Sequence, residues 1–572
     1  LPLIFSREMF GSVGDPTTST SLAPSTTLVP PCFRDADVSW VTMASVLVLG
    51  MFPGLAFFEA GLLRRKNTTS ILAQVFFGLA VQTVMWFICG FSLTFGPDAG
   101  GAGFIGNLDY GLFLNVNIAN CHAGSSIPTS LFALFQLMFA AITPLLITGS
   151  IAERMTFKSF IPFVLLWEFF VYYPIAHWIF DPHGWLARLG AQDFAGGIVI
   201  HTTAGAASLV AVFLLGRRAG YDKHGGHFPY SSLPLACIGA TLLWTGWFGF
   251  NGGSALGANS VAVAAVMNSQ IAAATCSVVF TALTTWRDPA HRVSLIAIIN
   301  GAVAGLAGIT PASGYVSPLS AFILGILLAL AAWGSVWLLK HKLHLDDALE
   351  VSAVHGIPGV VGALFIGFAG QRSINSAGAD GLFIRGGGSG KLLGVQILAI
   401  LITLIWTVFW TVAILKLLAK LLGGIRVSDE HEQRGLAVAE HGEAPEIIDS
   451  FNISQWSQRR RGGRRHHGKN RHGDEAEEEG EANGGVVGDT SSTQEQPEED
   501  DVEETDDFDD GGGYGTRGGV IPHHGNIRTG GGSGTTAEGH GGAVHVQTTA
   551  QDEPLLPRRQ QQQATAMVTP TT

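Results

Sequence analysis

The stretches GGIVIHTTAGAASLV (196–210) and VSAVHGIPGVVGALF (351–365) each place one histidine within an apolar segment of membrane-spanning length. An ionisable side chain in a hydrocarbon span is energetically costly and usually marks a substrate or ion path. A single histidine of this kind would be explained more simply as a hydrogen-bonding group between packed helices. Two of them, His201 and His355, in matching surroundings favour a path that both side chains line.

The two histidine segments share further features. Each histidine is followed four residues later by a glycine and is preceded eight residues earlier by an aspartate, Asp193 or Asp347. A pattern that recurs in two halves of a membrane chain is typical of an internal structural repeat. The sequence therefore predicts two related halves that meet at the histidines.

Composition places the chain among membrane proteins. Of its 572 residues, 47% are hydrophobic and only 14% are charged, and the mean hydropathy is positive. Much of the acidic charge lies in two C-terminal runs, 474–479 and 497–510, so the net charge of −12 says little about the partners of the apolar part. Nothing in the pattern favours a nucleic-acid partner. The five cysteines form neither a disulfide scaffold nor a metal-binding motif, and no metal or cofactor is expected.

Eleven apolar segments are each long enough to cross a ~30 Å hydrocarbon core as a helix. The fold class predicted is therefore an all-α polytopic membrane protein with eleven transmembrane helices. Two groups of five spans, with one extra helix, would form a 5+5 inverted repeat, because five crossings turn the second copy upside down. The segments are 38–62, 70–95, 129–151, 159–180, 195–216, 233–256, 258–285, 293–311, 318–339, 350–369 and 391–422.

Basic residues predict the orientation. They concentrate in alternate connections between spans, for example at Arg64, Arg65 and Lys66 and again at Arg217 and Arg218. Short loops rich in lysine and arginine face the cytoplasm. The N-terminus is therefore expected outside and the C-terminus inside, in a multi-pass protein of the plasma membrane.

The chain divides into four predicted regions. Residues 1–37 resemble a flexible extracellular arm, 38–422 form the membrane domain, 423–450 form a cytoplasmic regulatory tail, and 451–572 are a disordered low-complexity tail. Mixed charged and apolar residues in the third region predict docking on the inner loops, and an unidentified cytoplasmic regulator is a possible partner. Cys32 and Cys121 both fall on the predicted outer side, where a disulfide is possible.

Several motifs carry a resemblance to a known family. IAERM (151–155), PIAHW (174–178), QDFAGGIVIHTTAG (192–205), LLWTGWFGFNGGS (242–254) and AVHGIPGVVG (353–362) resemble signatures of the ammonium transporter (Amt/Mep/Rh) family, in its ammonium transporter branch. The resemblance covers about residues 38–446. It implies a homotrimer with one pore per subunit, eleven helices, and conduction of ammonium or ammonia through a membrane of lipid.

The resemblance also implies roles for individual residues. His201 and His355 match the pore-lining histidine pair, and Trp247 matches a tryptophan that flanks it. Phe139 and Phe250 match two phenylalanines that stack across the pore as a gate.

At the outer mouth, Ser254 matches a serine that helps to receive the cation, and Phe135 lies one helical turn from the gate residue Phe139. Asp193 matches an aspartate beneath this recruitment site with a structural and electrostatic role. Phe180 stands where the family usually has tryptophan, and phenylalanine binds cations less well through its ring face. Trp178, two residues away, would point to a different helix face.

These residues suggest a way to separate ammonium from potassium. Ammonium can donate hydrogen bonds and lose a proton, whereas potassium can do neither. Aromatic faces and a serine oxygen would collect the cation, two phenylalanine rings would exclude it, and the imidazoles would hold ammonia and relay the proton.

Of three other functions, the sequence leaves two open. An intramembrane metalloenzyme would need three or four ligands, and two histidines without an HExxH motif fall short of that, so no enzyme is expected. A sensor that keeps the fold but conducts little could couple through the tail. An electroneutral ammonia or carbon dioxide channel is the third alternative, and electrical recording would separate it from ammonium transport.

Overall fold

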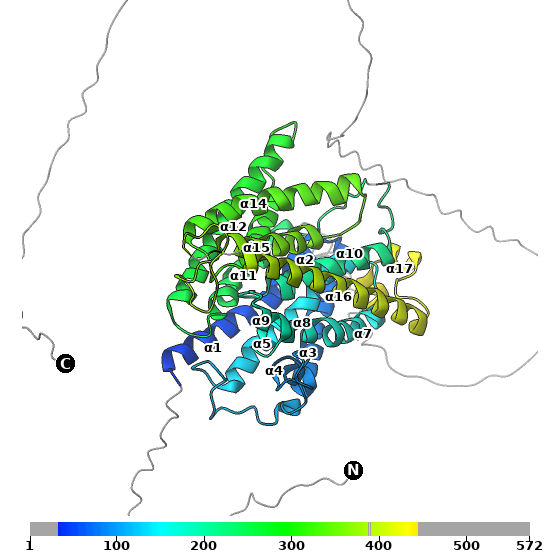
Figure 1. The fold of residues 1–572 in the computed structure, drawn as a ribbon. Helices are drawn as coiled ribbons and strands as arrows, with labels where there is room; N and C mark the ends of the chain where they lie inside the picture. The colour runs from blue at the N-terminus through cyan, green and yellow to red at the C-terminus, as the bar shows by residue number, and fades with distance from the viewer. Residues whose placement is uncertain (1–32, 224, 387, 389, 444–572) are drawn as a thin grey trace, which may run out of the picture. The chain divides into compact units, whose positions relative to one another are not determined.

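The computed structural model describes residues 33–443 except 224, 387 and 389, and regular structure in this part of the chain is helical. Figure 1 shows the helices packed against one another. They are α1 (Asp35–Leu49), α2 (Met51–Leu62), α3 (Thr68–Met85), α4 (Phe91–Phe95), α5 (Thr129–Leu145), α6 (Thr148–Ile151), α7 (Phe157–Trp167), α8 (Tyr173–Phe180), α9 (Trp185–Leu189), α10 (Thr203–Leu215), α11 (Leu233–Gly253), α12 (Ser260–Arg287), α13 (Leu295–Ile309), α14 (Pro318–Trp337), α15 (Ile357–Ala369), α16 (Gly390–Leu422), α17 (Asp429–Arg434) and α18 (Leu436–His441).

Shorter helical turns link or extend these helices. Among them are two 3₁₀ turns and five wider π-helical turns. They are η1 (Arg65–Asn67), η2 (Trp86–Gly90), η3 (Gly111–Phe113), η4 (Glu168–Tyr172), η5 (Gly197–Thr202), η6 (Leu338–Lys342) and η7 (Ser352–Gly356).

The predicted all-α membrane architecture is confirmed. In the described residues, ten continuous helical segments are long and apolar enough to cross a membrane, and each overlaps one predicted span. Large apolar side chains on their outer faces remain exposed, including Val278, Leu319, Ile405 and Leu421, each at least 66% exposed. Exposed apolar surface of this extent suits contact with lipid. Of the predicted arm, only residues 33–37 are described, and the first helix already begins at Asp35.

The remaining predicted span, 293–311, which is the eighth along the chain, is a shorter helix than expected. Helix α13 has 15 residues, and the chain turns away after Ile309 while staying buried. Non-helical backbone at this depth is tolerated only where its polar groups are bonded. The Nδ2 group of Asn268 on α12 donates to the carbonyl oxygens of Ser313 at 2.8 Å and Val316 at 2.7 Å. The side chain of Asn268 therefore allows the helix to end early.

The two histidine segments cross at glycine residues. Turn η5 packs against α15, and reciprocally η7 packs against α10. A Cβ atom added to Gly205 would lie 2.2 Å from the Cα atom of Gly356, and one added to Gly359 would lie 2.6 Å from the carbonyl oxygen of Gly197. The glycines four residues after each histidine thus let the two broken helices approach backbone to backbone.

Residues 423–443 are the described part of the predicted regulatory tail, and they contact the loops at one end of the bundle. The Val427 N–H donates to the Arg154 carbonyl at 2.9 Å, and the Leu436 N–H donates to Asn67 Oδ1 at 2.9 Å. The carboxylate of Glu432 is fully buried, accepts from Arg426 at 2.7 Å and binds the Ala219 N–H. Residues 444–450 and the predicted low-complexity region lie outside the described residues.

Candidate functional site

The two histidines meet at the crossing of their segments. The Nδ1 atoms of His201 and His355 are 3.4 Å apart, and their ring centroids are 5.4 Å apart with planes 26° from parallel. Both residues lie on π-helical turns, η5 and η7. A wide turn of this kind often marks a functional site. Only one hydrogen can occupy the Nδ1–Nδ1 contact, so one imidazole donates there and the other accepts.

Trp247 on α11 lies beside both imidazoles. Its ring centroid is 5.5 Å from that of His201 and 6.5 Å from that of His355, and it is within 23° of parallel to both rings. The indole N–H donates to Thr310 Oγ1 at 2.9 Å, and the Thr310 hydroxyl donates to the Leu306 carbonyl at 2.7 Å. This short chain of hydrogen bonds fixes the plane of the indole. Thr310 was not singled out in the sequence, because nothing local marks it as a partner of Trp247.

Aromatic rings continue in single file from the histidines. The Phe139 and Phe250 rings are stacked, and both residues are at most 2% exposed. Successive ring centroids are separated by 4.8 Å for Phe135–Phe139, 4.2 Å for Phe139–Phe250, 6.2 Å for Phe250–His201 and 5.4 Å for His201–His355. The structure therefore brings five predicted site residues into one row.

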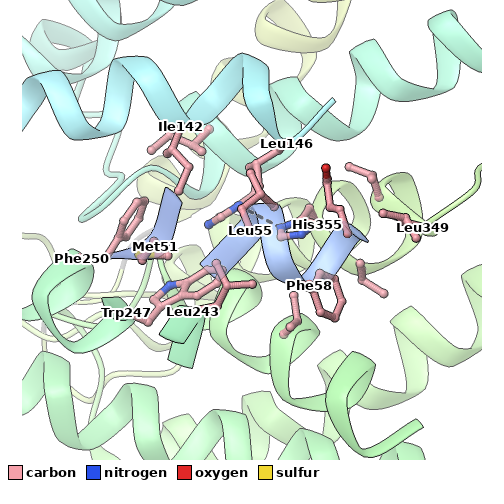
Figure 2. Close-up of a pocket in the computed structure, with 16 residues that line it drawn as sticks. Met51, Leu55, Phe58, Ile142, Leu146, Leu243, Trp247, Phe250, Leu349 and His355 are labelled. Carbon is pink, nitrogen blue, oxygen red and sulfur yellow. Dashed lines mark hydrogen bonds between the residues drawn. The ribbon is translucent and has the colours of Figure 1, made fainter. Parts of the chain in front are cut away.

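A cavity runs along the histidine side of this row. Figure 2 shows Phe250 and Leu349 at opposite ends of it, with His355 between them and a dashed line marking the contact between the imidazoles. Most lining side chains are apolar; the others are the two histidines, Trp247 and Glu59. The buried Nε2 atom of His201 has no hydrogen-bond partner among the described residues. That atom is free to bind a small polar molecule.

Ser254 and Phe135 lie together beyond the stacked phenylalanines. Ser254 directly follows α11, and a Cβ atom on the neighbouring Gly253 would lie 2.7 Å from the Phe135 ring. The Ser254 hydroxyl donates to the Phe250 carbonyl at 2.9 Å. Its hydrogen is thereby engaged, and its oxygen can accept a hydrogen bond from an incoming donor.

Phe180 ends α8 and is partly buried against the core. Among the ring contacts of the described residues, none joins Phe180 to Phe135 or Phe250. Trp178 belongs elsewhere: its indole N–H donates to the Phe104 carbonyl at 2.7 Å, and its ring contacts Trp406 at 5.1 Å between centroids. Trp178 therefore sits in a separate aromatic cluster.

Asp193 and Asp347 cap the two histidine turns. Both Asp193 carboxylate oxygens are occupied by backbone N–H groups at 2.7 to 3.0 Å, from Gly196, Gly197, Ile198 and Val199. Asp347 accepts the Ser352 N–H at 2.8 Å. Carboxylates at helix N-termini stabilise the unpaired N–H groups there. Each aspartate thus holds the turn that carries a histidine, and Asp193 is engaged by backbone rather than by the row of rings.

The described part of the chain contains no group of three or more His, Cys, Asp or Glu side chains that could hold a metal ion. Cys121 is disulfide-bonded, whereas Cys89, Cys237 and Cys276 are free. Cys32, its predicted partner, lies outside the described residues.

Comparison with known proteins now assigns the family. The sequence model of the Ammonium Transporter Family matches residues 39–446. The chain belongs to the ammonium transporter family. Among curated members, it is 50% identical over 409 residues to ammonium transporter 1 of Dictyostelium discoideum, an alignment that covers 71% of this chain and 86% of that protein. It is 38% identical over 410 residues to ammonium transporter Amt1 of Archaeoglobus fulgidus, covering 72% and 98%.

Solved structures of ammonium transporter relatives share the fold. The crystal structure of Saccharomyces cerevisiae Mep2 is 33% identical and superposes with a TM-score of 0.64, covering 71% of this chain and 92% of that one. A structure described as a sensor Amt protein is 31% identical, with a TM-score of 0.63 and coverage of 71% and 98%. The family assignment confirms the resemblance found in the sequence motifs.

Glu59 also lines the cavity of this ammonium transporter family member, and the sequence motifs assign no role to it. The apolar context of FFEAGL (57–62) marks it as unusual, but the sequence alone does not place it on the same cavity as His355.

Proposed function

We propose that this protein transports ammonium across the plasma membrane, moving ammonia and its proton past His201 and His355. The observation that carries the proposal is the 3.4 Å contact between the two Nδ1 atoms in an apolar cavity next to stacked phenylalanines. An apolar passage opposes a bare cation. The imidazole pair offers a route for a proton that potassium does not have.

The outer mouth would receive the cation. Ser254 offers a hydroxyl oxygen whose hydrogen is already engaged, and the ring of Phe135 lies next to it. Aromatic faces attract cations by about 0.5–2 kcal/mol. Phe180 would contribute a weaker aromatic face than tryptophan would, and Asp193 would support the site by holding turn η5.

The stacked pair Phe139 and Phe250 would act as the gate. Both rings are almost fully buried, so the passage at this point is closed by side chains. Rotation of one ring would admit a molecule as small as ammonia. The apolar surface of the two rings would exclude the hydrated cation. The cation must then leave its proton behind for the relay.

The histidine contact supports such a relay. When a proton reaches Nε2 of His201, the hydrogen at its Nδ1 atom can pass to Nδ1 of His355. His355 then releases its own Nε2 hydrogen on the far side. Each step breaks one N–H bond and forms another, and the net result is one proton moved past Trp247. Imidazole suits this task because its ordinary pKa lies near neutrality.

The wider assembly is proposed from the family and the loop charges. We infer a homotrimer with one pore per subunit, an external N-terminus, and a cytoplasmic tail whose residues 424–446 regulate conduction. The contacts of Glu432 and Leu436 with the inner loops support the last point. Native mass measurement in mild detergent tests the trimer.

A sensor is the second candidate, because a structure described as a sensor Amt protein has a similar fold. Electrical recording on purified protein in supported membranes separates the candidates. Transport predicts an inward current on adding ammonium and none on adding potassium. A sensor predicts ammonium binding with negligible current and uptake, and an ammonia channel predicts uptake without current. Either of these last results would contradict the proposal.

A further inference from the structure

Glu59 is a buried carboxyl group that takes no part in the proposed histidine relay. The residue is 2% exposed and lies on α2, where Met51, Leu55 and Phe58 also line the cavity. Residues spaced in this way share one face of a helix. Met51 and Glu59 are about 12 Å apart along the helix axis. Figure 2 shows Met51 near Phe250 and Phe58 toward Leu349, so α2 runs along the cavity away from the gate.

Contacts around Gly149 place the Glu59 carboxyl at the far end of the cavity. A Cβ atom at Gly149 would lie 3.0 Å from Glu59 Oε1, 2.8 Å from a methyl group of Val351 and 3.2 Å from the Leu349 Cβ atom. Leu349 and Val351 belong to the connection between η6 and η7. That connection also carries Asp346, which forms ion pairs with arginines next to the docked tail residues. Glu59 therefore lies at the tail side of the cavity.

The hydrogen bonds of Glu59 suit both of its protonation states. Thr148 Oγ1 lies 2.8 Å from Glu59 Oε2 and is also bonded to the carbonyl oxygen of Leu145. A hydroxyl group has one hydrogen and two lone pairs. With Glu59 ionised, Thr148 donates to the carboxylate. With Glu59 protonated, the carboxylic acid donates to Thr148, which turns its own hydrogen to Leu145. In both states Glu59 keeps its hydrogen bond to Thr148, and only the Leu145 carbonyl gains or loses the Thr148 hydrogen.

No competing titratable group shares this position in the described residues. The cavity is otherwise lined by apolar side chains, Trp247 and the histidine pair. Most titratable groups on the elements around Glu59 have partners of their own. These pairs are Glu153 with Arg64 and Arg218, Arg154 with Asp346, Asp347 with the Ser352 N–H, Glu350 with Lys340, and Lys66 with the Gln433 carbonyl. Two other titratable groups are Cys237 on α11 and His344, two residues before Asp346.

We propose that Glu59 is the proton acceptor at the tail-side end of the path, an inference that rests on the proposed ammonium transport. The Nε2–H bond of protonated His355 breaks and an O–H bond forms on the Glu59 carboxylate. Ammonia that has travelled the same cavity then takes this proton, so the O–H bond breaks, an N–H bond forms, and ammonium leaves a carboxylate behind. The carboxylate is restored for the next proton, and charge and atoms balance.

Glu59→Gln is the direct test, because glutamine keeps the shape and a hydrogen bond to Thr148 but cannot exchange a proton. Ammonium-evoked current would be recorded from purified protein at several pH values on the tail side. We expect Glu59→Gln to lower the current by at least about tenfold and to remove its dependence on tail-side pH. Glu59→Asp, which restores an acid at this place, should recover a pH-dependent current.

Glu168→Gln is the matched control. Glu168 is another fully buried carboxyl group in a span, on η4, but does not line the cavity. Its variant should retain the wild-type pH dependence, and thermal unfolding in detergent would check that every variant is folded. A folded Glu59→Gln variant with wild-type current and pH dependence would overturn the proposal. So would a current that depends on tail-side pH in Glu59→Gln but not in Glu59→Asp. A wild-type protein without ammonium current would overturn the proposed function as well, which distinguishes the two failures.

Discussion

Gly205 and Gly356 touch so closely that a Cβ atom on Gly205 would lie 2.2 Å from the Cα atom of Gly356. This contact joins the two histidine segments, and no flexible side chain is available there to move aside. Because backbone would have to shift, Gly205→Ala should separate η7 from α10 and disturb the spacing of the imidazoles. The expected outcome is a strong loss of ammonium transport together with a lower thermal midpoint in detergent.

Gly394→Ala provides the control for that substitution. Gly394 lies on α16, another membrane span, and has no atoms near the place of an added Cβ. Alanine is also the better helix former by about 1 kcal/mol. This variant should therefore keep transport and stability. Equal behaviour of the two alanine variants would show that the glycine contact is not needed.

Phe180→Trp should tighten the outer site. An indole ring attracts a cation more strongly than a phenyl ring does, and a gain of about 0.5–1 kcal/mol would lower the apparent KM for ammonium roughly two- to fivefold. Maximal current should change little, because Phe139, Phe250 and the histidines are unaltered. Trp178→Phe, in the separate aromatic cluster, should affect stability and leave KM unchanged. An unchanged KM in Phe180→Trp would remove Phe180 from the recruitment site.

The ion-pair cluster beneath the tail should make stability depend on pH. Burial raises the pKa of Asp346, but hydrogen bonds and charge from Arg218 and Arg154 outweigh it and leave the pKa below its usual range. A carboxyl with a lowered folded-state pKa stabilises the fold above its ordinary pKa of about 4. That stabilisation is lost as the pH falls through the lowered pKa.

Asp346→Asn tests this cluster. It removes the carboxylate that Arg154 and Arg218 share, and only Arg218 keeps a second one, from Glu153. Removing one partner of a buried pair costs about 3–5 kcal/mol. The thermal midpoint at neutral pH should fall clearly, and acidification should lower it less than in the wild type. Asp288→Asn, in a solvent-exposed pair with Arg292, should hardly change it. Identical acid sensitivity of the wild type and Asp346→Asn would contradict the assignment.

The tail gives a truncation test. Ending the chain before residue 451 should preserve transport, because it keeps Glu432 and Leu436 and their contacts with Ala219 and Asn67. Ending it before residue 424 should impair transport, since the Arg154 carbonyl and Asn67 lose their tail partners. Uptake of ammonium, normalised to the amount of folded protein, measures the difference. Two truncations that behave alike would place the regulatory boundary elsewhere.

The sequence predicted the spans and the histidine pair because both depend on local features. Length and apolar composition identify a membrane helix, and the repeated His-to-Gly spacing identifies the crossing. The early end of α13 depends instead on Asn268, more than 40 residues away in the chain, which satisfies the Ser313 and Val316 carbonyls. Only the folded structure reveals such a partner.

The π-helical turns and the minor site residues were missed for a similar reason. Nothing local distinguishes GIVIHT from an ordinary helical turn, yet contact with α15 places it in the wide η5 turn. Thr310 accepts a hydrogen bond from Trp247, and Glu59 is bonded to Thr148. Both partners lie on other helices, so the sequence does not reveal these contacts. For Phe180, the motif gave a position at the end of α8, and the structure adds no ring contact with Phe135.

The central claim is that protons cross through the contact between His201 and His355. Its most direct test is the current carried by the double variant His201→Ala and His355→Ala, recorded with ammonium and then with potassium. Both imidazoles are at most 7% exposed and line one cavity, so their removal deletes the relay and opens room for water. The account predicts that selective ammonium current disappears and that potassium current appears in its place. Wild-type ammonium current and selectivity in the folded double variant would contradict the account.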